Sequence, residues 1–348
     1  YSCVGHVDDV AGGRPMKNKV NPLTARQAFE EACVHGRVMR WDSYSPKVKP
    51  STSTSVGVTL ATDLHYGVNI DEAEVPGNQV DRRTMARRTA FLTARRMDYK
   101  QGKRQGSRVL LGGDIIEGEI HGRGTNAPLA QQVFDAQWCL HHMINANLAA
   151  FGSVHVDCAT GNHDRWAHRG PGRVVDGKWD SLSTLVYAWL AGVHRNNPRV
   201  TFSIPKTPYT VWKAPGGQVC VLTHGDTVYY IGNPASSISY SKARSQTNAL
   251  SKVTKRTHGG DVELVCLGHH HSPAIFQIDD FTVAVNGCLS GISQYSQSLG
   301  YHVGKPRQLI FEQTTEHVMG HPEFCDVSGG DADKEMDKLV PTPPDVAT

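Results

Sequence analysis

Short apolar segments alternate along the chain with longer segments of helical periodicity. Five apolar runs of strand length occupy residues 56–61, 108–111, 154–158, 219–222 and 262–267. Apolar residues at helical spacing predict helices over residues 78–100, 128–150, 181–194 and 239–257. This alternation of strands and helices is typical of an α/β protein. Three later runs predict consecutive antiparallel strands at 274–278, 281–285 and 308–311.

Both ends of the chain differ from this central region. Residues 1–55 hold one short helical pattern at 24–40 and end in a serine and threonine tract at 51–55, which is typical of a linker. Residues 326–348 are polar, contain proline and show no periodicity. We therefore expect an N-terminal extension over 1–55, one large domain over 56–325 and a flexible C-terminal tail over 326–348.

Composition and charge are ordinary for a globular protein. The 348 residues include 36 lysines and arginines against 33 aspartates and glutamates, and 39% are hydrophobic. Eight cysteines contain no CxxC pair, which predicts buried free thiols in a reducing compartment. No apolar run approaches the roughly 18 residues of a membrane span, and the N-terminus lacks the apolar core of a signal peptide. These features predict a soluble cytoplasmic protein without a membrane partner.

Polar clusters follow the apolar runs, and they contain many of the 18 histidines. The clusters are Asp63-Leu64-His65, Gly113-Asp114, Gly161-Asn162-His163-Asp164, His224-Gly225-Asp226 and Gly268-His269-His270-His271. The carboxyl ends of strands are where open α/β sheets bind ligands, so these clusters are expected to converge on one crevice. A single histidine is more often a hydrogen-bonded residue of the surface or core than a ligand. The recurrence of Asp, Asn and His at equivalent strand ends favours a site.

The donors in these clusters exceed what one metal ion takes from a protein. They are Asp63, His65, Asp114, Asn162, His224, His269 and His271. The set predicts two divalent ions that act together on a displacement at phosphorus. Asp114 is the expected bridge, because the preceding glycine pair lets the backbone approach the site. Nitrogen and oxygen ligands suit Mn, Fe, Zn, Co or Ni, and Mn is the expected ion.

In this order the motifs resemble those of the calcineurin-like metallophosphoesterase superfamily, over about residues 56–285. The resemblance implies a β-sandwich of two mixed sheets flanked by helices, with a catalytic dinuclear metal site at the strand ends. It implies one ion held by Asp63, His65, Asp114 and His271, and a second held by Asp114, Asn162, His224 and His269. It further implies that His163 protonates the leaving oxygen and that Asp164 orients His163.

Two further features qualify this resemblance. Glu117 stands where phosphatases of the superfamily often carry aspartate, so we expect it to have a supporting role outside the metal shell. The stretch 286–291, followed by Gln294-Tyr295, is similar to phage-encoded members that are often labelled DNA-repair exonucleases. That branch would place the protein in the host cytoplasm.

Basic and aromatic residues around the motifs bear on the substrate. Arginines for phosphate and tryptophans for base stacking are typical of a nucleotide or single-strand site, and the candidates are Arg165, Trp166, Arg169, Arg173 and Trp179. The tryptophans could equally anchor a long loop in the core. The arginine-rich stretch 82–108 is open to two interpretations, an acid-paired structural helix or a contact with a phosphate backbone. A third basic segment spans 242–256.

The sequence thus predicts a dinuclear-metal phosphodiesterase, a hydrolase acting on nucleic acid or nucleotides like a nuclease. Metal-activated water would be the nucleophile and His163 the general acid. One alternative is a phosphomonoesterase of small molecules or phosphoproteins with the same metal site. Another is a metal-bearing binding module without catalysis, against which the complete set of donors and His163 weighs.

Overall fold

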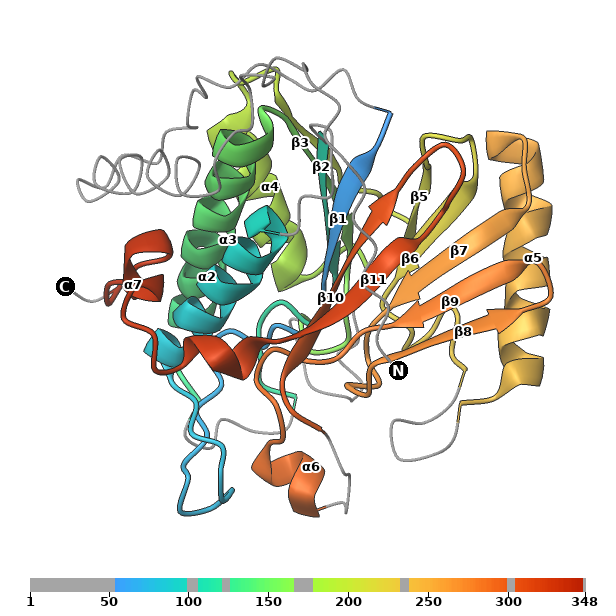
Figure 1. Ribbon diagram of the computed structural model, residues 1–348. Coiled ribbons are helices and arrows are strands. Elements are labelled where there is room, and N and C mark those ends of the chain that lie inside the picture. Colours follow the sequence, from blue (N-terminus) through green and yellow to red (C-terminus); the bar gives the residue numbers. More distant parts are fainter. Residues whose placement is uncertain are drawn as a thin grey trace, which may run out of the picture.

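A computed structural model describes residues 54–98, 106–120, 126–165, 178–231, 238–298 and 304–346. Two β-sheets pack face to face in the centre of the molecule, and helices cover the outer face of each (Figure 1). Both sheets contain parallel and antiparallel pairs. The predicted fold class, a sandwich of two mixed sheets flanked by helices, is confirmed.

The first sheet has the strand order β11-β10-β1-β2-β3-β4. Its parallel strands are β1 (Val56–Ala61), β2 (Gly106–Gly112), β3 (Val154–Ala159) and β4 (Val200–Ser203). The antiparallel strands β10 (Arg307–Gln313) and β11 (Gly320–Asp326) extend it beside β1. The late strand β10 thereby pairs with the first strand, β1, in the interior of the sheet.

The second sheet has the strand order β5-β6-β7-β9-β8. Its parallel strands are β6 (Val219–Thr223), β7 (Val262–Leu267) and β9 (Phe281–Val285). The antiparallel strands β5 (Tyr209–Lys213) and β8 (Ala274–Ile278) form its edges.

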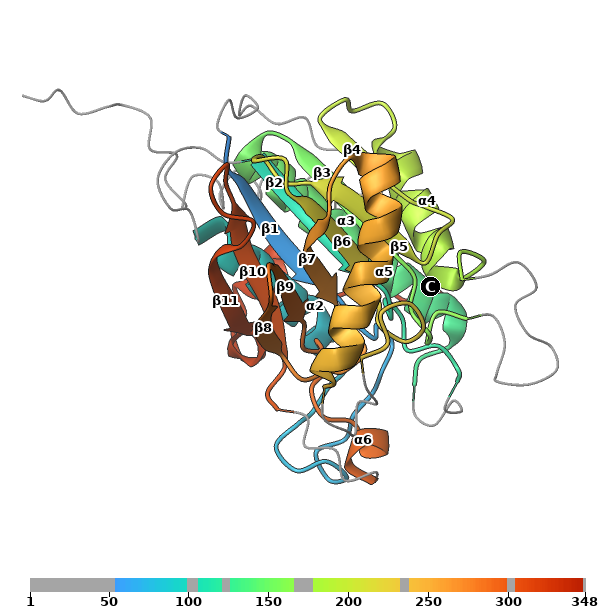
Figure 2. The same ribbon diagram turned by 90° about the vertical axis from the view of Figure 1, so that its right-hand side faces the viewer.

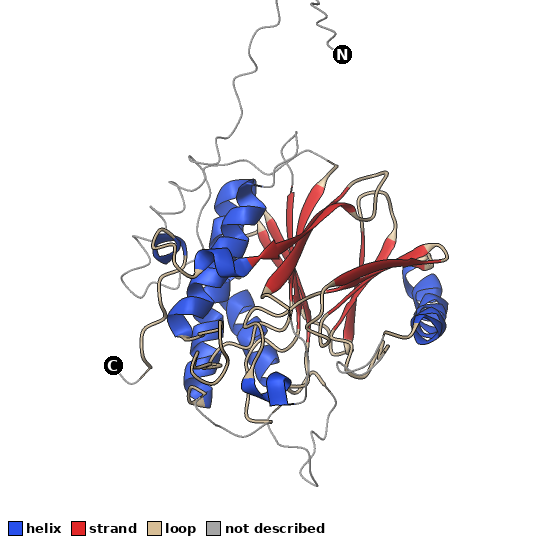
Figure 3. Cartoon of the chain, turned by 60° about the horizontal axis from the view of Figure 1, so that its bottom comes forward, coloured by secondary structure: helices blue, strands red, loops and turns tan. Residues whose placement is uncertain are grey.

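The long helices lie outside the two sheets, as the view in Figure 3 shows for the helices as a class. Figures 1 and 2 show α2 (Arg82–Asp98), α3 (Leu129–Phe151) and α4 (Leu182–His194) on the first sheet and α5 (Tyr240–His258) across the second. All four were predicted, and Ser181 and Ser239 cap the first turns of α4 and α5. No described helix combines the length and apolar character needed to cross a membrane.

The parallel strands are buried on both faces, which explains their nearly continuous apolar sequences. In β2, Val109 and Leu111 face the helices, whereas Leu110 packs between the two sheets. Val58 and Leu60 of β1 join Leu110 in that second cluster. Successive side chains of a strand point to opposite faces, so one short run supplies two cores.

The prediction of a flexible tail over 326–348 is wrong for residues 326–346, which the structure describes. After Asp326 the chain forms the 3-10 turn η1 (Val327–Gly330) and the short helix α7 (Met336–Leu339), which pack against α2. Trp138 Nε1 donates a hydrogen bond to the Pro341 carbonyl at 2.8 Å. The segment is polar because ion pairs hold much of it, so its sequence resembles that of a tail. The boundary expected at 325 therefore does not hold.

Residues 1–53 lie outside the described residues, and with them the helical pattern at 24–40 and most of the tract at 51–55. The structure adds elements that the sequence did not reveal, namely the strands β4, β5 and β11, the turn η1 and the short helices α6 (Gln294–Ser298) and α7.

Candidate metal centre

The loops that follow β1, β2, β3, β6 and β7 meet at one end of the sandwich. Backbone hydrogen bonds tie them together, from Asp63 N to the Gly113 carbonyl at 3.0 Å and from Gly268 N to the His224 carbonyl at 3.1 Å. Asp114 Oδ1 also accepts a hydrogen bond from His163 N at 2.8 Å. The convergence expected from the positions of the motifs is therefore present.

The backbone at this end adopts an unusual conformation. Positive φ angles of 48–67° occur at five predicted ligands: Asp63, His65, Asp114, His269 and His271. For residues other than glycine the left-handed region costs roughly 1–2 kcal/mol each, and such strain gathers at functional sites. The fold maintains this strain while it turns these side chains toward one another.

The first group of donors contains Asp63, His65 and His271, whose ligand atoms lie within 4.8 Å of one another. His65 Nε2 is 3.2 Å from His271 Nε2, and His271 Nε2 is 3.2 Å from Asp63 Oδ1. Asp63 is fully buried. Two imidazole nitrogens that converge beside a carboxylate are suitable ligands for a divalent cation.

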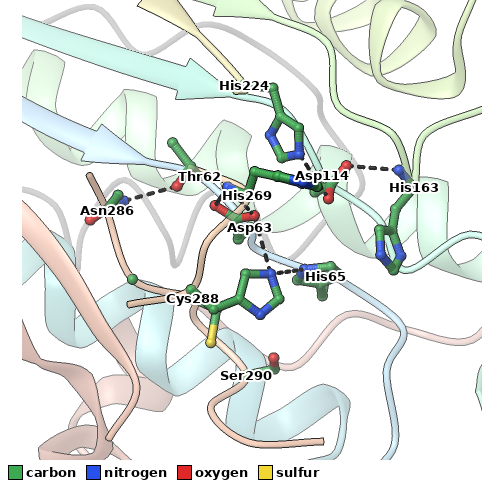
Figure 4. Close-up of polar contacts among 12 residues, drawn as sticks. Thr62, Asp63, His65, Asp114, His163, His224, His269, Asn286, Cys288 and Ser290 are labelled. Carbon is green, nitrogen blue, oxygen red and sulfur yellow. Dashed lines mark hydrogen bonds and ion pairs between the residues drawn. The ribbon is translucent and has the colours of Figure 1, made fainter. Parts of the chain in front are cut away.

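The second group contains Asp114, His224 and His269, also within 4.8 Å. His224 Nε2 lies 3.1 Å from Asp114 Oδ2 and 3.1 Å from Asn162 Oδ1, so the predicted amide ligand joins this group. Figure 4 shows His224, Asp114 and His269 beside the first group. The predicted donors are thus brought together as two adjacent sets.

Hydrogen bonds orient the imidazole rings from outside. His65 Nδ1 contacts Glu117 Oε2 at 2.8 Å, and His224 Nδ1 contacts the Gly112 carbonyl at 3.0 Å. Each contact leaves Nε2 directed at the other donors, as in metal sites whose histidines donate their second ring N–H outward. Glu117 therefore lies where a supporting carboxylate outside the metal shell would lie.

The electrostatics fit a cation in each group. Burial alone would raise the pKa of Asp63, but contacts with His271 and His224 hold it at about 2. Burial would likewise lower the pKa of His224, whereas the Asp114 carboxylate raises it to about 9. Burial, aided by His224, lowers the pKa of His269 to about 3. Ionised carboxylates beside imidazoles that can release protons are the donors a divalent ion binds.

His163 lies beside the first group, with its ring centroid 4.6 Å from that of His65. His163 Nδ1 is 2.8 Å from the Glu117 carbonyl, an acceptor, so Nδ1 is the donor in this contact. His163, Glu117 and His65 also form a third cluster of donor atoms within 4.8 Å.

Asp164 does not hold the position expected for an orienting carboxylate. It is fully buried, and its oxygens accept hydrogen bonds from the backbone N–H groups of Asp114, Ile115 and Gly161 at 2.9–3.0 Å. The expectation that Asp164 orients His163 is therefore corrected. Asp164 joins the loops after β2 and β3, and the Glu117 carbonyl holds the ring of His163.

A pair of buried amides that sequence reasoning missed supports the first group. Gln308 Nε2 donates to the Thr62 carbonyl at 3.1 Å, and Asn286 Nδ2 donates to Gln308 Oε1 at 2.8 Å and to the Leu60 carbonyl at 3.0 Å. Figure 4 shows Asn286 beside Thr62. These contacts fix the end of β1 immediately before Asp63. Gln308 lies within the apolar run of β10. A polar residue at such a position was the sequence signal that could have revealed a buried amide.

The predicted substrate residues are only partly described. Arg165 Nε donates to the Asn162 carbonyl at 2.7 Å, and Trp179 precedes α4 with Lys206 Nζ 4.9 Å from its ring centroid. Lys178 pairs with Asp226, two residues beyond His224. Trp166, Arg169 and Arg173 lie outside the described residues.

The arginine-rich stretch fits the structural interpretation where it is described. Ion pairs on α2 join Arg82 to Asp135 and Asp345, Arg83 and Arg87 to Asp337, Arg88 to Asp331, and Arg95 to Glu323. The acids come from α3, β11 and the C-terminal segment, far away in sequence. These guanidinium groups are therefore used to assemble the protein.

Comparisons with known proteins found no matching family model and no matching curated protein. Among solved structures, an archaeal phosphodiesterase is 14% identical, with a TM-score of 0.35 over 77% of this chain and 99% of that one. A predicted phosphoesterase from Streptococcus pneumoniae is 10% identical, with a TM-score of 0.32 over 78% and 97%. A mutant of Vps29 from Entamoeba histolytica is 14% identical, with a TM-score of 0.32 over 78% and 98%. Values this low do not establish a family, and the fold class rests on the sheets and helices described above.

Proposed function

We propose that this protein is a metal-dependent phosphodiesterase of the calcineurin-like metallophosphoesterase type, acting on nucleic acid or nucleotides. The observation that carries the proposal is the pair of adjacent donor groups at the strand ends, with His163 beside them. Two divalent ions, expected to be Mn²⁺, would be held by Asp63, His65 and His271 and by Asn162, His224 and His269, with Asp114 between them.

Such ions, when bound, polarise a phosphoryl group and lower the pKa of the water that attacks it. The protein supplies the orientation of the donors and a proton for the leaving oxygen. His163 suits the second task because the Glu117 carbonyl fixes its ring through Nδ1, beside the first group of donors. Glu117 holds both His65, through its carboxylate, and His163, through its carbonyl.

The proposed substrate class rests on side chains near the centre. Arg165 follows Asp164 directly, and the Lys178–Asp226 pair brings a second cation and Trp179 toward the loop that carries His224. Cations beside an aromatic ring suit a phosphate backbone and a stacked base. We include Trp166, Arg169 and Arg173 in this surface on their sequence alone. The nuclease-like branch and a phage origin belong to the same proposal.

The test compares hydrolysis of a chromogenic phosphodiester with that of its monoester in the presence of Mn²⁺, followed by single- and double-stranded oligonucleotides. We expect faster cleavage of the diester, and oligonucleotide binding that weakens steeply as salt rises, because neutralised phosphates release counterions. Faster cleavage of the monoester, together with oligonucleotides that bind no better than mononucleotides at moderate salt, would identify a phosphomonoesterase instead.

A further inference from the structure

Arg88 of α2 is a buried guanidinium whose hydrogen-bonding capacity is fully used. Its side chain is 2% exposed. Nε and Nη2 donate to the two Asp331 oxygens at 2.8 and 2.7 Å, Nη2 also reaches Asn78 Oδ1 at 3.3 Å, and Nη1 donates to the carbonyls of Leu289 and Ser290 at 3.0 and 2.8 Å. Arginine has five N–H donors in a fixed planar arrangement, and each has an acceptor here.

The two carbonyls belong to the loop 288–292, which borders the candidate metal centre. Leu289 N donates to the Asp63 carbonyl at 3.0 Å, and the Cys288 side chain, whose thiol donates to the Gly291 carbonyl at 3.4 Å, lies beside the His271 ring. Figure 4 shows Cys288 and Ser290 beside Asp63 and His65. The loop thus contacts Arg88 on one side and two members of the first donor group on the other.

Asp331 reaches Arg88 because the C-terminal segment, residues 327–346, approaches α2 closely. A Cβ atom at Gly330 would lie 2.8 Å from Phe91 Cβ and 2.9 Å from the Arg87 carbonyl oxygen, so only glycine fits this contact without a shift. Arg87 Nη1 also donates to the Asp331 carbonyl at 2.7 Å. Both the backbone and the carboxylate of Asp331 are therefore fixed by α2.

We propose that Arg88 and Asp331 form a positioning pair through which the C-terminal segment sets the loop 288–292 and, with it, Asp63 and His271. The pair touches neither substrate nor ion, and it acts on the affinity of the first donor group for a divalent cation. This inference rests on the proposed metal centre.

The physical reason is the cost of a buried charge without its counterion. Arg88 orients its Nη1 donors toward the loop only while Nε and Nη2 are held by Asp331 in a bidentate pair. When the charge of Asp331 is removed, the buried guanidinium loses that compensation and moves toward other acceptors or water. The carbonyls of Leu289 and Ser290 then lose their fixed donor, and the strained left-handed backbone of Asp63 and His271 loses a support.

The matched control is Asp337, which lies in the same C-terminal segment and forms a bidentate pair with Arg87 of the same helix. The described contacts of Arg87 do not include the loop 288–292. Asp331→Asn and Asp337→Asn therefore remove equivalent charges from the same docked segment, and only the first acts on the metal centre.

The experiment measures Mn²⁺ binding to the full chain by calorimetry, and thermal unfolding of the metal-free protein. Both variants should lower the unfolding temperature, whereas Asp331→Asn alone should weaken the affinity of one Mn²⁺ site by about 10-fold, the scale of lost outer contacts in metal sites. Arg88→Lys, which keeps the charge but cannot bridge Asp331 and the loop, should have the same effect and replaces Asp331→Asn if that variant does not fold.

Equal Mn²⁺ affinities in Asp331→Asn, Asp337→Asn and the unaltered protein would overturn the positioning role, and so would equal losses in both variants. If the unaltered protein binds Mn²⁺ but cleaves no phosphodiester, the proposed activity fails while the positioning pair is still tested by binding. If the unaltered protein binds no Mn²⁺, both ideas fail.

Discussion

Asp114 stands between the two donor groups, and its surroundings are those of a bridging carboxylate. Oδ2 lies 3.1 Å from His224 Nε2, and Oδ1 accepts the backbone N–H of His163. Burial would raise the pKa of Asp114, but His224 and His163 hold it well below its usual range. Its carboxylate is therefore ionised and available to ions on both sides.

Asp114→Asn should weaken both Mn²⁺ sites, because a neutral amide replaces the charge that two cations share. We expect at least a 10-fold loss of affinity at each site, measured by calorimetry and by metal content after dialysis. Asp226→Asn, which alters an acid paired with Lys178 and not a predicted ligand, should keep both ions. One site with unchanged affinity in Asp114→Asn would contradict the bridge.

His163→Ala should separate catalysis from metal binding. Metal content should stay unchanged, while turnover of a phosphodiester should fall by about 10²–10⁴-fold because the leaving oxygen loses its proton donor. The loss should be smaller for a p-nitrophenyl diester, whose leaving group needs little protonation, than for an alkyl diester. Because His163 also belongs to a donor cluster with His65 and Glu117, loss of metal in this variant would show it to be a ligand.

At the scale of elements, the interface of α3 and α4 carries three buried histidines: His141, His142 and His194. The ring centroids of His141 and His194 are 5.3 Å apart. Burial lowers the pKa of His142 and of His194 from 6.5 to about 4, and burial together with His142 and His194 lowers that of His141 well below 6.5. The helices therefore pack around neutral imidazoles.

This packing predicts that the protein loses stability in mild acid. Between pH 6.5 and 4 the unfolded chain binds protons that the folded protein excludes, so the free energy of unfolding falls as pH falls through that window. The loss should amount to several kcal/mol in total, since one pKa unit corresponds to about 1.4 kcal/mol. Urea unfolding of the metal-free protein at pH 7 and pH 5 measures it. His194→Gln, which cannot titrate, should reduce the difference, and an unchanged difference would contradict this origin.

The elements also show where sequence patterns succeed. The helix α3 was predicted because it carries a sustained apolar stripe over 23 residues. The strands β4 and β5 span only four and five residues and escaped notice. So short a strand offers too few positions for its alternation to stand out from a loop.

At the scale of the whole molecule, the metal centre depends on segments from both ends of the described chain. Asp63 follows β1. Gln308 of β10 supports it through Thr62, and Asp331 beyond β11 supports it through Arg88 and the loop 288–292. Through the contacts of Gln308 and Asp331, the C-terminal part of the described chain helps to build the metal centre. The arginines of α2 also join distant parts of the chain, since their acidic partners lie 53 to 263 residues away in sequence.

The sequence by itself determined the chemistry of the site. Donors such as Asp63, Asp114 and His224 follow apolar strands, and parallel strands bring their carboxyl ends to one edge, so the convergence of these residues required no coordinates. The α/β class followed from the same local patterns, because side-chain periodicity reports which face of an element is buried.

Only the tertiary structure decided what holds those donors in place. The left-handed backbone at His269 and His271, the use of Asp164 to join two loops, and the pairing of Arg88 with Asp331 have no local signature. A polar segment after a strand looks the same whether it is solvated or paired with a distant helix. Its free energy depends on partners that the chain brings near only when it folds, which is why the C-terminal segment was mistaken for a tail.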